Sequence, residues 1–234
     1  MFPIGDTDVR EAGPGLWTVI LVLLNVGVFA VQITLLRPGL TEFFNRYGVV
    51  PSRLVEGEQL YSVFTSMFIH GGWVHLITNM LFLWVFGDNV EAALGRIVYP
   101  LFYLGGGVAA MAAHVLVNPG SDLPSVGASG AIGALLGAYI VMFPRAQVKV
   151  LLLLGFFVIV RRITAVVFLG VWFAMQFLTG LAGLGVETAE AGGVAVWAHI
   201  GGFLFGVVIG FLFRDRAKDL TLEYERQHRR RGMV

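Results

Sequence analysis

The stretch Val126-Gly127-Ala128-Ser129-Gly130-Ala131 decides the fold of this chain. It is a run of small residues that opens an apolar segment, with one hydroxyl group near its centre. From that hydroxyl, small residues recur at every fourth position, as Ser129, Gly133 and Gly137, and this spacing places them on one face of a helix. The segment is therefore predicted to be a helix with a glycine-lined face and a serine at its start.

A second segment, near the end of the chain, carries a matching pattern. Its positions i, i+3, i+7 and i+11 are His199, Gly202, Gly206 and Gly210, which again share one helix face. Small residues let two helix backbones approach closely inside a membrane. If the two faces meet, Ser129 and His199 come together as a nucleophile beside a base. Gly202 and Gly206 are given a structural role in that contact.

The composition is that of a membrane protein. Of the 234 residues, 57% are hydrophobic and only 13% are charged, whereas a soluble domain carries about 25% charged residues. The absence of cysteine excludes disulfides, thiolate chemistry and cysteine-based metal sites. No glycine-rich phosphate loop and no nucleic-acid motif is present, so we expect no cofactor and no nucleic-acid partner.

Six segments approach the length of about 20 mostly apolar residues that a membrane-spanning helix needs. They are Leu16–Leu36, Gly72–Phe86, Ile97–Val117, Ser129–Phe143, Ile163–Leu181 and Gly193–Phe213. The predicted fold class is all-α, a polytopic membrane protein with six transmembrane helices. The six-helix domain covers residues 16–213, between an N-terminal segment of residues 1–15 and a basic tail of residues 214–234.

Three other segments are predicted to lie outside the spans. Residues 37–60 mix charges, aromatic residues and prolines, which indicates a structured loop partly at the membrane interface. Gly87–Gly95 contains two acidic residues and is predicted to be a turn in water. Val148–Val160 is 13 residues long, which is short for a span, so an interfacial or re-entrant segment is expected.

The basic residues indicate the orientation of these helices. With six spans, three of the 16 lysines and arginines fall on one side, namely Arg37, Arg46 and Arg53, and the remaining 13 fall on the other. Basic residues gather on the cytoplasmic side, so the chain is predicted to lie in the cell membrane with both termini in the cytoplasm. The arginine-rich tail is interpreted as a topology anchor that contacts anionic lipid.

The predicted orientation places the candidate catalytic residues toward the outer side of the membrane. Ser129 begins a helix at its outer end, where free N–H groups and the helix dipole favour developing negative charge. His199 lies six residues into the last helix, about 9 Å deep. The loop before Ser129 must therefore dip into the membrane, which is tolerated only where the backbone is buried in protein or wetted. We expect a water-filled cavity open to the outside. No acidic residue occurs in the last two predicted spans, so a Ser-His dyad is expected rather than a triad.

Other polar residues also lie within the predicted spans. His75 and Asn79 are spaced i, i+4 on one helix face and could donate hydrogen bonds to an oxyanion, together with the backbone N–H of Ser129. The alternative is that they hydrogen-bond a neighbouring helix. His70 is given a structural role in shaping the loop before this helix. A zinc site built from His70, His75 and His199 would lack the His-Glu-x-x-His pattern, so no metal is expected.

The motifs around these residues resemble the rhomboid family of intramembrane serine proteases. The matching stretches, in the family's order, are Phe68-Ile69-His70-Gly71-Gly72-Trp73-Val74-His75-Leu76-Ile77-Thr78-Asn79-Met80, Phe86-Gly87-Asp88-Asn89-Val90-Glu91, Gly127-Ala128-Ser129-Gly130-Ala131 and Ala198-His199-Ile200-Gly201-Gly202-Phe203. The resemblance implies Ser129 as nucleophile and His199 as general base. It also implies His75 and Asn79 as oxyanion-hole donors, and a structural role for Glu91.

The chain departs from the family pattern at two places. Some bacterial members carry Trp-Arg in the first loop, where this chain has Gln59-Leu60-Tyr61. Some carry a tyrosine that stacks on the histidine four residues after the serine, where this chain has Gly133. The sequence therefore leaves open what holds the His199 ring. It also shows no partner for His114, to which no role is assigned.

These observations predict a serine endopeptidase that cleaves single-span membrane proteins near the outer leaflet, where the substrate helix unwinds. The expected partners are transmembrane protein substrates and the lipid bilayer, while the oligomeric state is left open. The substrate strand is expected to pair with backbone near Ser125, Val126, Gly193 and Val194. The segment Ile163–Leu181 is a candidate lateral gate.

Two alternatives belong to other classes of protein. The first is a catalytically inactive rhomboid-like binder or chaperone of membrane proteins. The second is a transporter, which would be expected to show inverted repeats and charged residues at the midplane, and the sequence shows neither.

Overall fold

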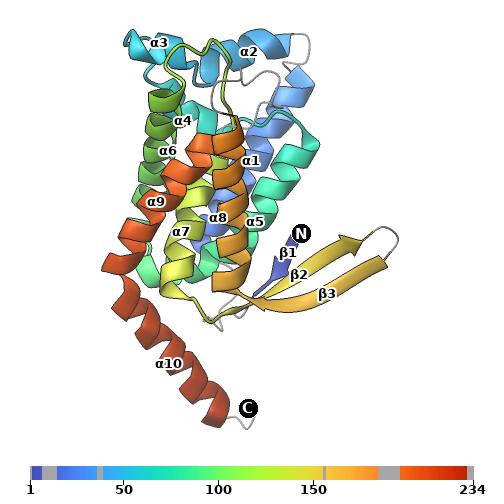
Figure 1. Cartoon of the computed structure of the whole chain (residues 1–234), viewed down its shortest axis with the longest axis vertical. Coiled ribbons are helices and arrows are strands. Elements are labelled where there is room, and N and C mark those ends of the chain that lie inside the picture. Colours follow the sequence, from blue (N-terminus) through green and yellow to red (C-terminus); the bar gives the residue numbers. More distant parts are fainter. Residues whose placement is uncertain (1, 7–14, 36–38, 155–156, 184–195, 231–234) are drawn as a thin grey trace.

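The computed structural model describes residues 2–6, 15–35, 39–154, 157–183 and 196–230. Long helices run alongside one another in a bundle (Figure 1). They are α1 (Leu16–Leu35), α5 (Trp73–Leu94), α6 (Val98–Val117), α7 (Ser129–Met142), α8 (Ala165–Ala182) and α9 (Val196–Leu212). Each corresponds to one of the six predicted helical segments, although residues 193–195 lie outside the described part of the chain.

Short elements cover the two ends of the bundle. One end carries α2 (Leu40–Tyr47), α3 (Pro51–Val55), α4 (Ser62–Thr65) and the 3-10 turn η2 (Ser66–Phe68). Helices α2 and α3 account for much of the structured loop predicted for residues 37–60. The other end carries the strands β1 (Phe2–Gly5), β2 (Gln147–Leu154) and β3 (Phe157–Thr164), together with the tail helix α10 (Arg214–Arg230) (Figure 1).

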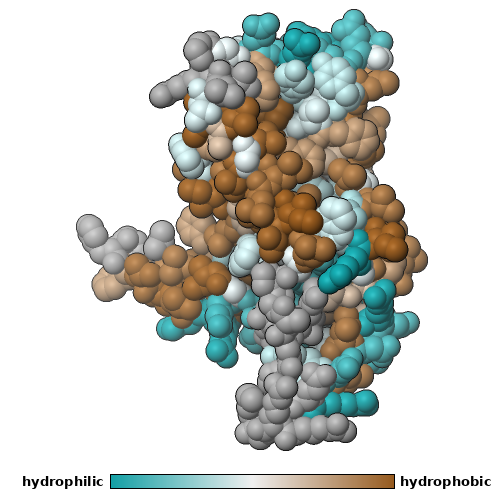
Figure 2. All heavy atoms as spheres, turned by 180° about the vertical axis from the view of Figure 1, so that it is seen from behind, coloured by the Kyte–Doolittle hydropathy of each residue, from teal (hydrophilic) through white to brown (hydrophobic). Residues whose placement is uncertain are grey.

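The helices make this a multi-pass membrane protein. In the described residues, α1, α6 and α8 are each long and apolar enough to cross a membrane. The number rises to five if two bent pairs, α4–η2 with α5 and α9 with α10, each count as one span. Figure 2 shows apolar residues over the middle of one face of the bundle and polar residues toward its ends.

The start of α7 lies deep in the bundle. Helix α6 has 20 residues and α7 has 14, and both reach the end of the bundle that carries the strands (Figure 1). At 1.5 Å per residue, α7 therefore begins about 9 Å below the opposite end of α6. The segment between them descends into the bundle, as the position of Ser129 in the sequence predicts.

Glycines bring α7 and α9 into backbone contact. A Cβ atom at Gly202 would overlap the carbonyl oxygen of Gly130, and one at Gly206 would overlap the carbonyl oxygen of Ala134. In the other direction, a Cβ at Gly133 would lie 2.8 Å from the carbonyl oxygen of His199. No side chain fits between the two backbones at these positions. The predicted meeting of the two glycine-lined faces is confirmed.

The predicted turn at Gly87–Gly95 is wrong, because residues 87–94 form the last two turns of α5 and Gly95 is its C-cap. The side chains of Asn89 and Glu91 are buried and bond other elements of the structure. The Glu91 carboxylate accepts hydrogen bonds from the backbone N–H groups of Trp17 (3.2 Å) and Thr18 (3.0 Å), at the free N-terminal end of α1. Asn89 donates to Asp6, which follows β1 (2.8 Å). Glu91 thus caps another helix, and a single sequence cannot distinguish this use of an acidic residue from exposure to water.

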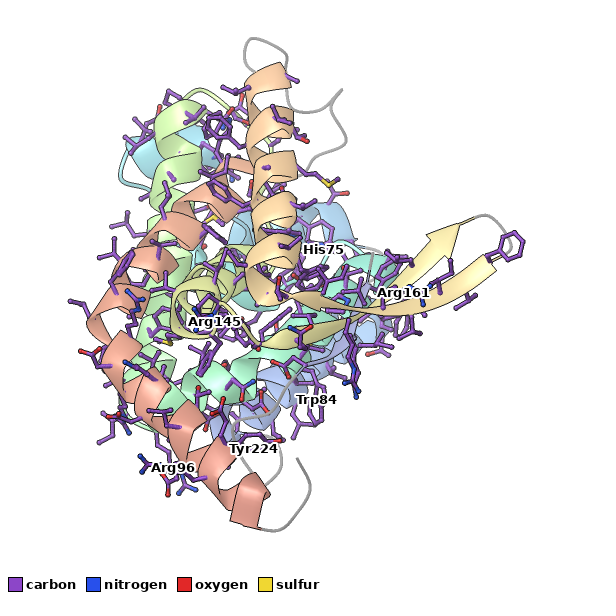
Figure 3. All side chains as sticks on the ribbon, turned by 60° about the horizontal axis from the view of Figure 1, so that its bottom comes forward. His75, Trp84, Arg96, Arg145, Arg161 and Tyr224 are labelled. Atoms are coloured by element: carbon purple, nitrogen blue, oxygen red, sulfur yellow. The ribbon has the colours of Figure 1, made fainter. Side chains whose placement is uncertain are left out.

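The segment 148–160 is part of a β-hairpin, so the all-α expectation is wrong at this point. Strands β1, β2 and β3 form one antiparallel sheet in that order. Val148 and Val150 are fully buried against the bundle, whereas Phe157 is 73% exposed near the tip of the hairpin. Figure 3 shows Arg161 on the hairpin where it leaves the bundle. An apolar outer half with basic residues nearer the bundle fits the predicted membrane interface.

The α7–α9 contact generates a stability prediction. Gly206→Ala forces the two backbones apart, and overpacking of this kind costs about 1–3 kcal/mol. We expect a lower midpoint of thermal unfolding in detergent. The matched control is Gly170→Ala on α8, where nothing lies within 4 Å of the added Cβ. Equal midpoints for the two variants would contradict the close contact.

Candidate active site

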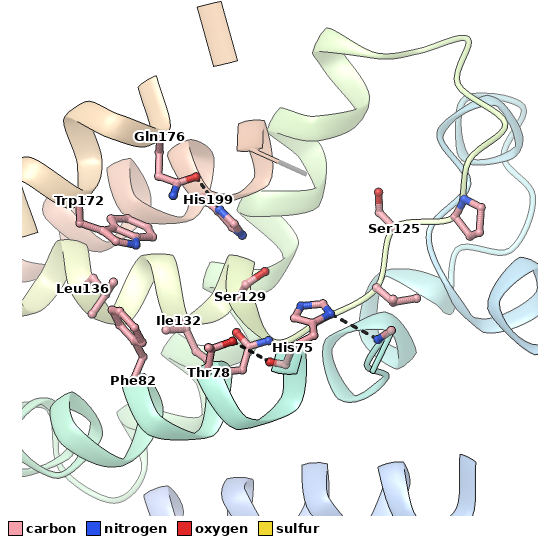
Figure 4. Close-up of a pocket in the computed structure, with 14 residues that line it drawn as sticks. His75, Thr78, Phe82, Ser125, Ser129, Ile132, Leu136, Trp172, Gln176 and His199 are labelled. Carbon is pink, nitrogen blue, oxygen red and sulfur yellow. Dashed lines mark hydrogen bonds between the residues drawn. The ribbon is translucent and has the colours of Figure 1, made fainter. Parts of the chain in front are cut away.

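A cavity of about 540 Å³ lies at the N-terminal end of α7. Its walls come from α5, the segment before α7, α7 itself, α8 and α9 (Figure 4). The predicted site residues that line it are Ser129, His199, His75, Asn79, Ser125 and Val126. Gly193 and Val194 lie outside the described residues. Segments that are more than 100 residues apart in the chain therefore meet around this one space.

Ser129 is the first residue of α7 and is half-buried. The turn before it passes directly over His75: a Cβ at Gly127 would lie 2.7 Å from His75 Nε2 and 3.6 Å from Ser129 Oγ. Gly127 also has a φ of +130°, which other residues rarely adopt. Its N–H donates to the carbonyl oxygen of Ser66 at 2.8 Å. Only glycine therefore suits this position, two residues before the hydroxyl.

The imidazole of His75 presents a donor to the cavity. Its Nδ1 accepts the backbone N–H of Gly71 at 3.3 Å. A ring nitrogen that accepts carries no hydrogen, so a neutral His75 carries its hydrogen on Nε2. That nitrogen is the one that faces Gly127 and Ser129.

Asn79 supplies a second donor. The residue is buried, and its Nδ2 has no hydrogen-bond partner among the described residues. A buried N–H group without a partner is costly and therefore rare. Asn79 lines the cavity one helical turn beyond His75. The two side chains together form a pair of donors that can receive an oxygen atom.

His70 lies behind this pair. It is fully buried, and its ring packs edge-on against the ring of His75 with the centroids 5.1 Å apart. Its backbone N–H donates to Gln32 Oε1 on α1 at 3.3 Å. These contacts place the turn from which α5 starts, in keeping with the structural role predicted for His70.

The His199 ring is held by α8. Its Nδ1 lies 3.0 Å from Oε1 of Gln176, and its centroid lies 6.0 Å from the ring of Trp172, with 37° between the planes. The stacking position that a tyrosine could fill at residue 133 is closed, because the backbone of α9 approaches Gly133 there. Within the described residues, the structure forms no hydrogen bond between Ser129 and His199 themselves. Catalytic hydrogen bonds are often long in unliganded enzymes and shorten in the substrate complex.

His114, which the sequence left without a role, holds the segment before Ser129. Asn118 Nδ2 donates to the carbonyl oxygen of His114 at 3.0 Å and lies 3.4 Å from its Nδ1. His114 Nε2 lies 2.8 Å from Ser125 Oγ. Ser125 also exchanges two backbone hydrogen bonds with Val49, at 2.9 and 2.8 Å. Gln176 and His114 were both missed because the site residues that they contact, His199 and Ser125, lie on other elements of the chain.

No group of three or more His, Cys, Asp or Glu side chains in the described residues is placed to hold a metal ion. His70, His75 and His199, which the zinc alternative would require, therefore form no such group.

Comparison with known proteins gives consistent matches. The family model described as Rhomboid domain matches residues 57–216. Rhomboid-like protein 11, chloroplastic, of Arabidopsis thaliana is 31% identical over 82% of the chain. Rhomboid protein 1, mitochondrial, of Saccharomyces cerevisiae is 28% identical over 89% of the chain, and the rhomboid protease GluP of Bacillus subtilis is 29% identical over 74%. The matches cover 63%, 55% and 35% of the length of these three relatives, respectively.

The contacts of His114 generate a prediction on local stability. His114→Leu removes its side-chain hydrogen bonds, each of which contributes about 0.5–1.5 kcal/mol. We expect the amide protons of Ser125 and Gly127 to exchange about tenfold faster with deuterium, because 1.4 kcal/mol corresponds to a factor of ten. Leu116→Ala is the control, since Leu116 lies on the same helix and is 80% exposed. Equal exchange in the two variants would show that His114 does not hold the segment.

Proposed function

The chain belongs to the rhomboid family, and from that premise we propose that it is an intramembrane serine endopeptidase. The observation that supports this proposal most is the convergence on one cavity of a hydroxyl at a helix N-terminus, an imidazole and two hydrogen-bond donors. The family includes a protein named as a protease, GluP of Bacillus subtilis. Peptide hydrolysis needs each of these groups in a site that water reaches.

In the proposed mechanism, His199 and Ser129 act as a dyad. The Nε2 atom of His199 removes the proton from Ser129 Oγ, and Oγ attacks the carbonyl carbon of the scissile bond. The negative oxygen that forms receives hydrogen bonds from His75 Nε2–H and Asn79 Nδ2–H. His199 then passes the proton to the leaving amine, and a water molecule hydrolyses the acyl-enzyme by the same steps.

The substrate is proposed to bind as an added strand beside the segment before α7. Ser125 already uses its backbone N–H and carbonyl group toward Val49. Because consecutive residues of an extended strand direct these groups to opposite sides, the backbone groups of Val126 face away from Val49. The predicted pairing with Ser125 is therefore revised, and the open edge is assigned to Val126. Gly193 and Val194 stay proposed as the opposite wall.

The placement in the membrane is proposed to be that of a six-span protein with cytoplasmic termini in the cell membrane. At the end of the bundle that carries β1 and α10, Figure 3 shows Arg96, Arg145 and Arg161. At the opposite end lie Arg46 and Arg53, on α2 and α3. This excess of basic residues at one end fits a cytoplasmic position for that end. The cavity then faces the outer leaflet, and the substrates are single-span proteins whose helix unwinds near the cut.

The second candidate is an inactive rhomboid-like protein that binds membrane proteins. One observation favours it, which is the missing hydrogen bond between Ser129 and His199 in the described part of the chain. Against it stands the intact set of four polar side chains around the cavity. An inactive binder would not need an unpartnered donor such as Asn79 Nδ2 beside a serine.

A fluorophosphonate probe distinguishes the two candidates. The purified protein in detergent is expected to be labelled covalently and to cut a generic single-span substrate, because Ser129 is activated by His199. Ser129→Ala is expected to abolish both activities while the unfolding temperature is retained. A wild-type protein that is neither labelled nor active would exclude the peptidase, and cleavage that persists in Ser129→Ala would exclude Ser129 as the nucleophile.

The oxyanion-hole assignment generates a kinetic prediction. Asn79→Ala removes one donor, and such a loss costs about 10²–10³ in kcat with little effect on KM. The matched control is Ile77→Ala on the same helix, where the side chain is 58% exposed on the outside of the bundle. Turnover by Asn79→Ala at the rate of this control would remove Asn79 from the mechanism.

A further inference from the structure

The groups that hold the His199 ring both come from α8. Trp172 and Gln176 are spaced one helical turn apart and so lie on the same face of that helix. The Trp172 ring lies beside the imidazole, tilted by 37° with the centroids 6.0 Å apart, and Gln176 bonds its Nδ1. Both line the cavity (Figure 4). The nucleophile is carried by α7 and the base by α9, but the orientation of the base is determined by a third helix.

The bond to Gln176 decides which nitrogen of His199 is basic. The amide oxygen Oε1 can only accept a hydrogen bond, so Nδ1 of His199 must carry the hydrogen. A neutral ring then has its lone pair on Nε2, the nitrogen that the proposed reaction requires as the base. In Ser-His-Asp enzymes, a carboxylate on Nδ1 does the same. Here a neutral amide takes that position, which keeps an unpaired carboxylate out of the membrane.

Helix α8 is loosely packed around this contact. Its buried residues are Ala165, Phe168, Leu169 and Gly180, near its two ends, so the ten residues between Leu169 and Gly180 include no buried side chain. The outward face of this middle part is apolar, with Met175 62% exposed. On the inward face, the ring of Phe173 stacks on Phe203 of α9 with the centroids 4.4 Å apart. The position of α8 against α9 at this level depends on a few ring contacts and on the Gln176 bond.

We propose that Gln176 is a positioning residue that fixes the tautomer and orientation of His199, so that the base is ready only while α8 is seated against α9. This inference rests on the proposed peptidase function and deepens it. When α8 moves so that the cavity opens sideways toward lipid, His199 Nδ1 loses its hydrogen bond to Gln176. The tautomer and orientation of the His199 ring are then no longer fixed. Cleavage then follows only after α8 packs against α9 again.

The first arm of the test measures kcat and KM in the full-length protein. Gln176→Leu, which keeps the bulk but loses the acceptor, is expected to lower kcat about 10-fold to 100-fold with KM unchanged, since general base catalysis contributes about 10²–10⁴. Gln176→Glu restores an acceptor and is expected to recover most of the rate. Met175→Leu, on the outward face, controls for changes in the helix itself. Wild-type kcat in Gln176→Leu, or a Gln176→Glu variant as slow as Gln176→Leu, would overturn the proposal.

The second arm tests whether kcat depends on the packing of α8 against α9. Phe173 does not line the cavity, so Phe173→Ala is expected to act only by loosening α8. We expect a severalfold loss of kcat in the wild-type background and no further loss in the Gln176→Leu background, because both substitutions remove the same effect. Losses that multiply would show that the seat of α8 acts by some route other than Gln176.

The third arm needs no activity and separates the inference from the proposed function. In protein with ¹⁵N-labelled histidines, the His199 signal is assigned by its loss in His199→Gln. Wild-type protein is expected to show the Nδ1–H tautomer, and Gln176→Leu is expected to show a substantial Nε2–H population. Failure of the peptidase assay with this tautomer shift present would reject the function alone. An identical tautomer in both proteins would reject the role of Gln176.

Discussion

The structure depends on the contact between the backbones of α7 and α9. In lipid, apolar side chains gain nothing by leaving the solvent, so helices associate through close packing and polar contacts. Gly133 on α7, with Gly202 and Gly206 on α9, removes the side chains that would keep the two helices apart. This contact brings Ser129 and His199 to one cavity. The glycines determine how closely α7 and α9 approach, and the other features of the site depend on that separation.

Most polar groups of the bundle follow the rule that backbone and side-chain donors away from water need partners. Glu91 receives the free N–H groups at the start of α1, and Gln32 holds the backbone of His70. Asn79 Nδ2 is one of the buried atoms without a partner among the described residues, and Asn79 lines the cavity. A donor left unpaired next to the proposed nucleophile is the property that an oxyanion site requires.

The sequence predicted the features that follow from periodicity. The four-residue spacing of small residues identified the α7–α9 contact, and apolar length identified the helices. The predictions from the sequence were wrong where a residue interacts with a partner far along the chain that no periodic spacing indicates. Glu91 looked like part of a turn because its partners lie more than 70 residues away. The segment Val148–Val160 looked too short for a span, and only the pairing of β2 with β3 shows that it is part of a sheet.

The same limit applies to the site. Ser129, His199, His75 and Asn79 were identified from their spacing and from their resemblance to a family. Gln176 and His114 were not, because neither belongs to a motif or a spacing pattern that points to its partner in the site. Their hydrogen-bond partners become evident only when α8, α9 and the segment before α7 are placed together. Residues that orient a catalytic group are harder to predict than the group itself.

The central claim is that Ser129 and His199 act on one carbonyl group across the α7–α9 contact. The most direct test is an experimental structure of the protein after reaction with a fluorophosphonate. The account predicts phosphorus bonded to Ser129 Oγ, its free oxygen within hydrogen-bond distance of His75 Nε2 and Asn79 Nδ2, and His199 Nε2 directed at Oγ. An adduct on another residue, or an oxygen that faces away from His75 and Asn79, would contradict it.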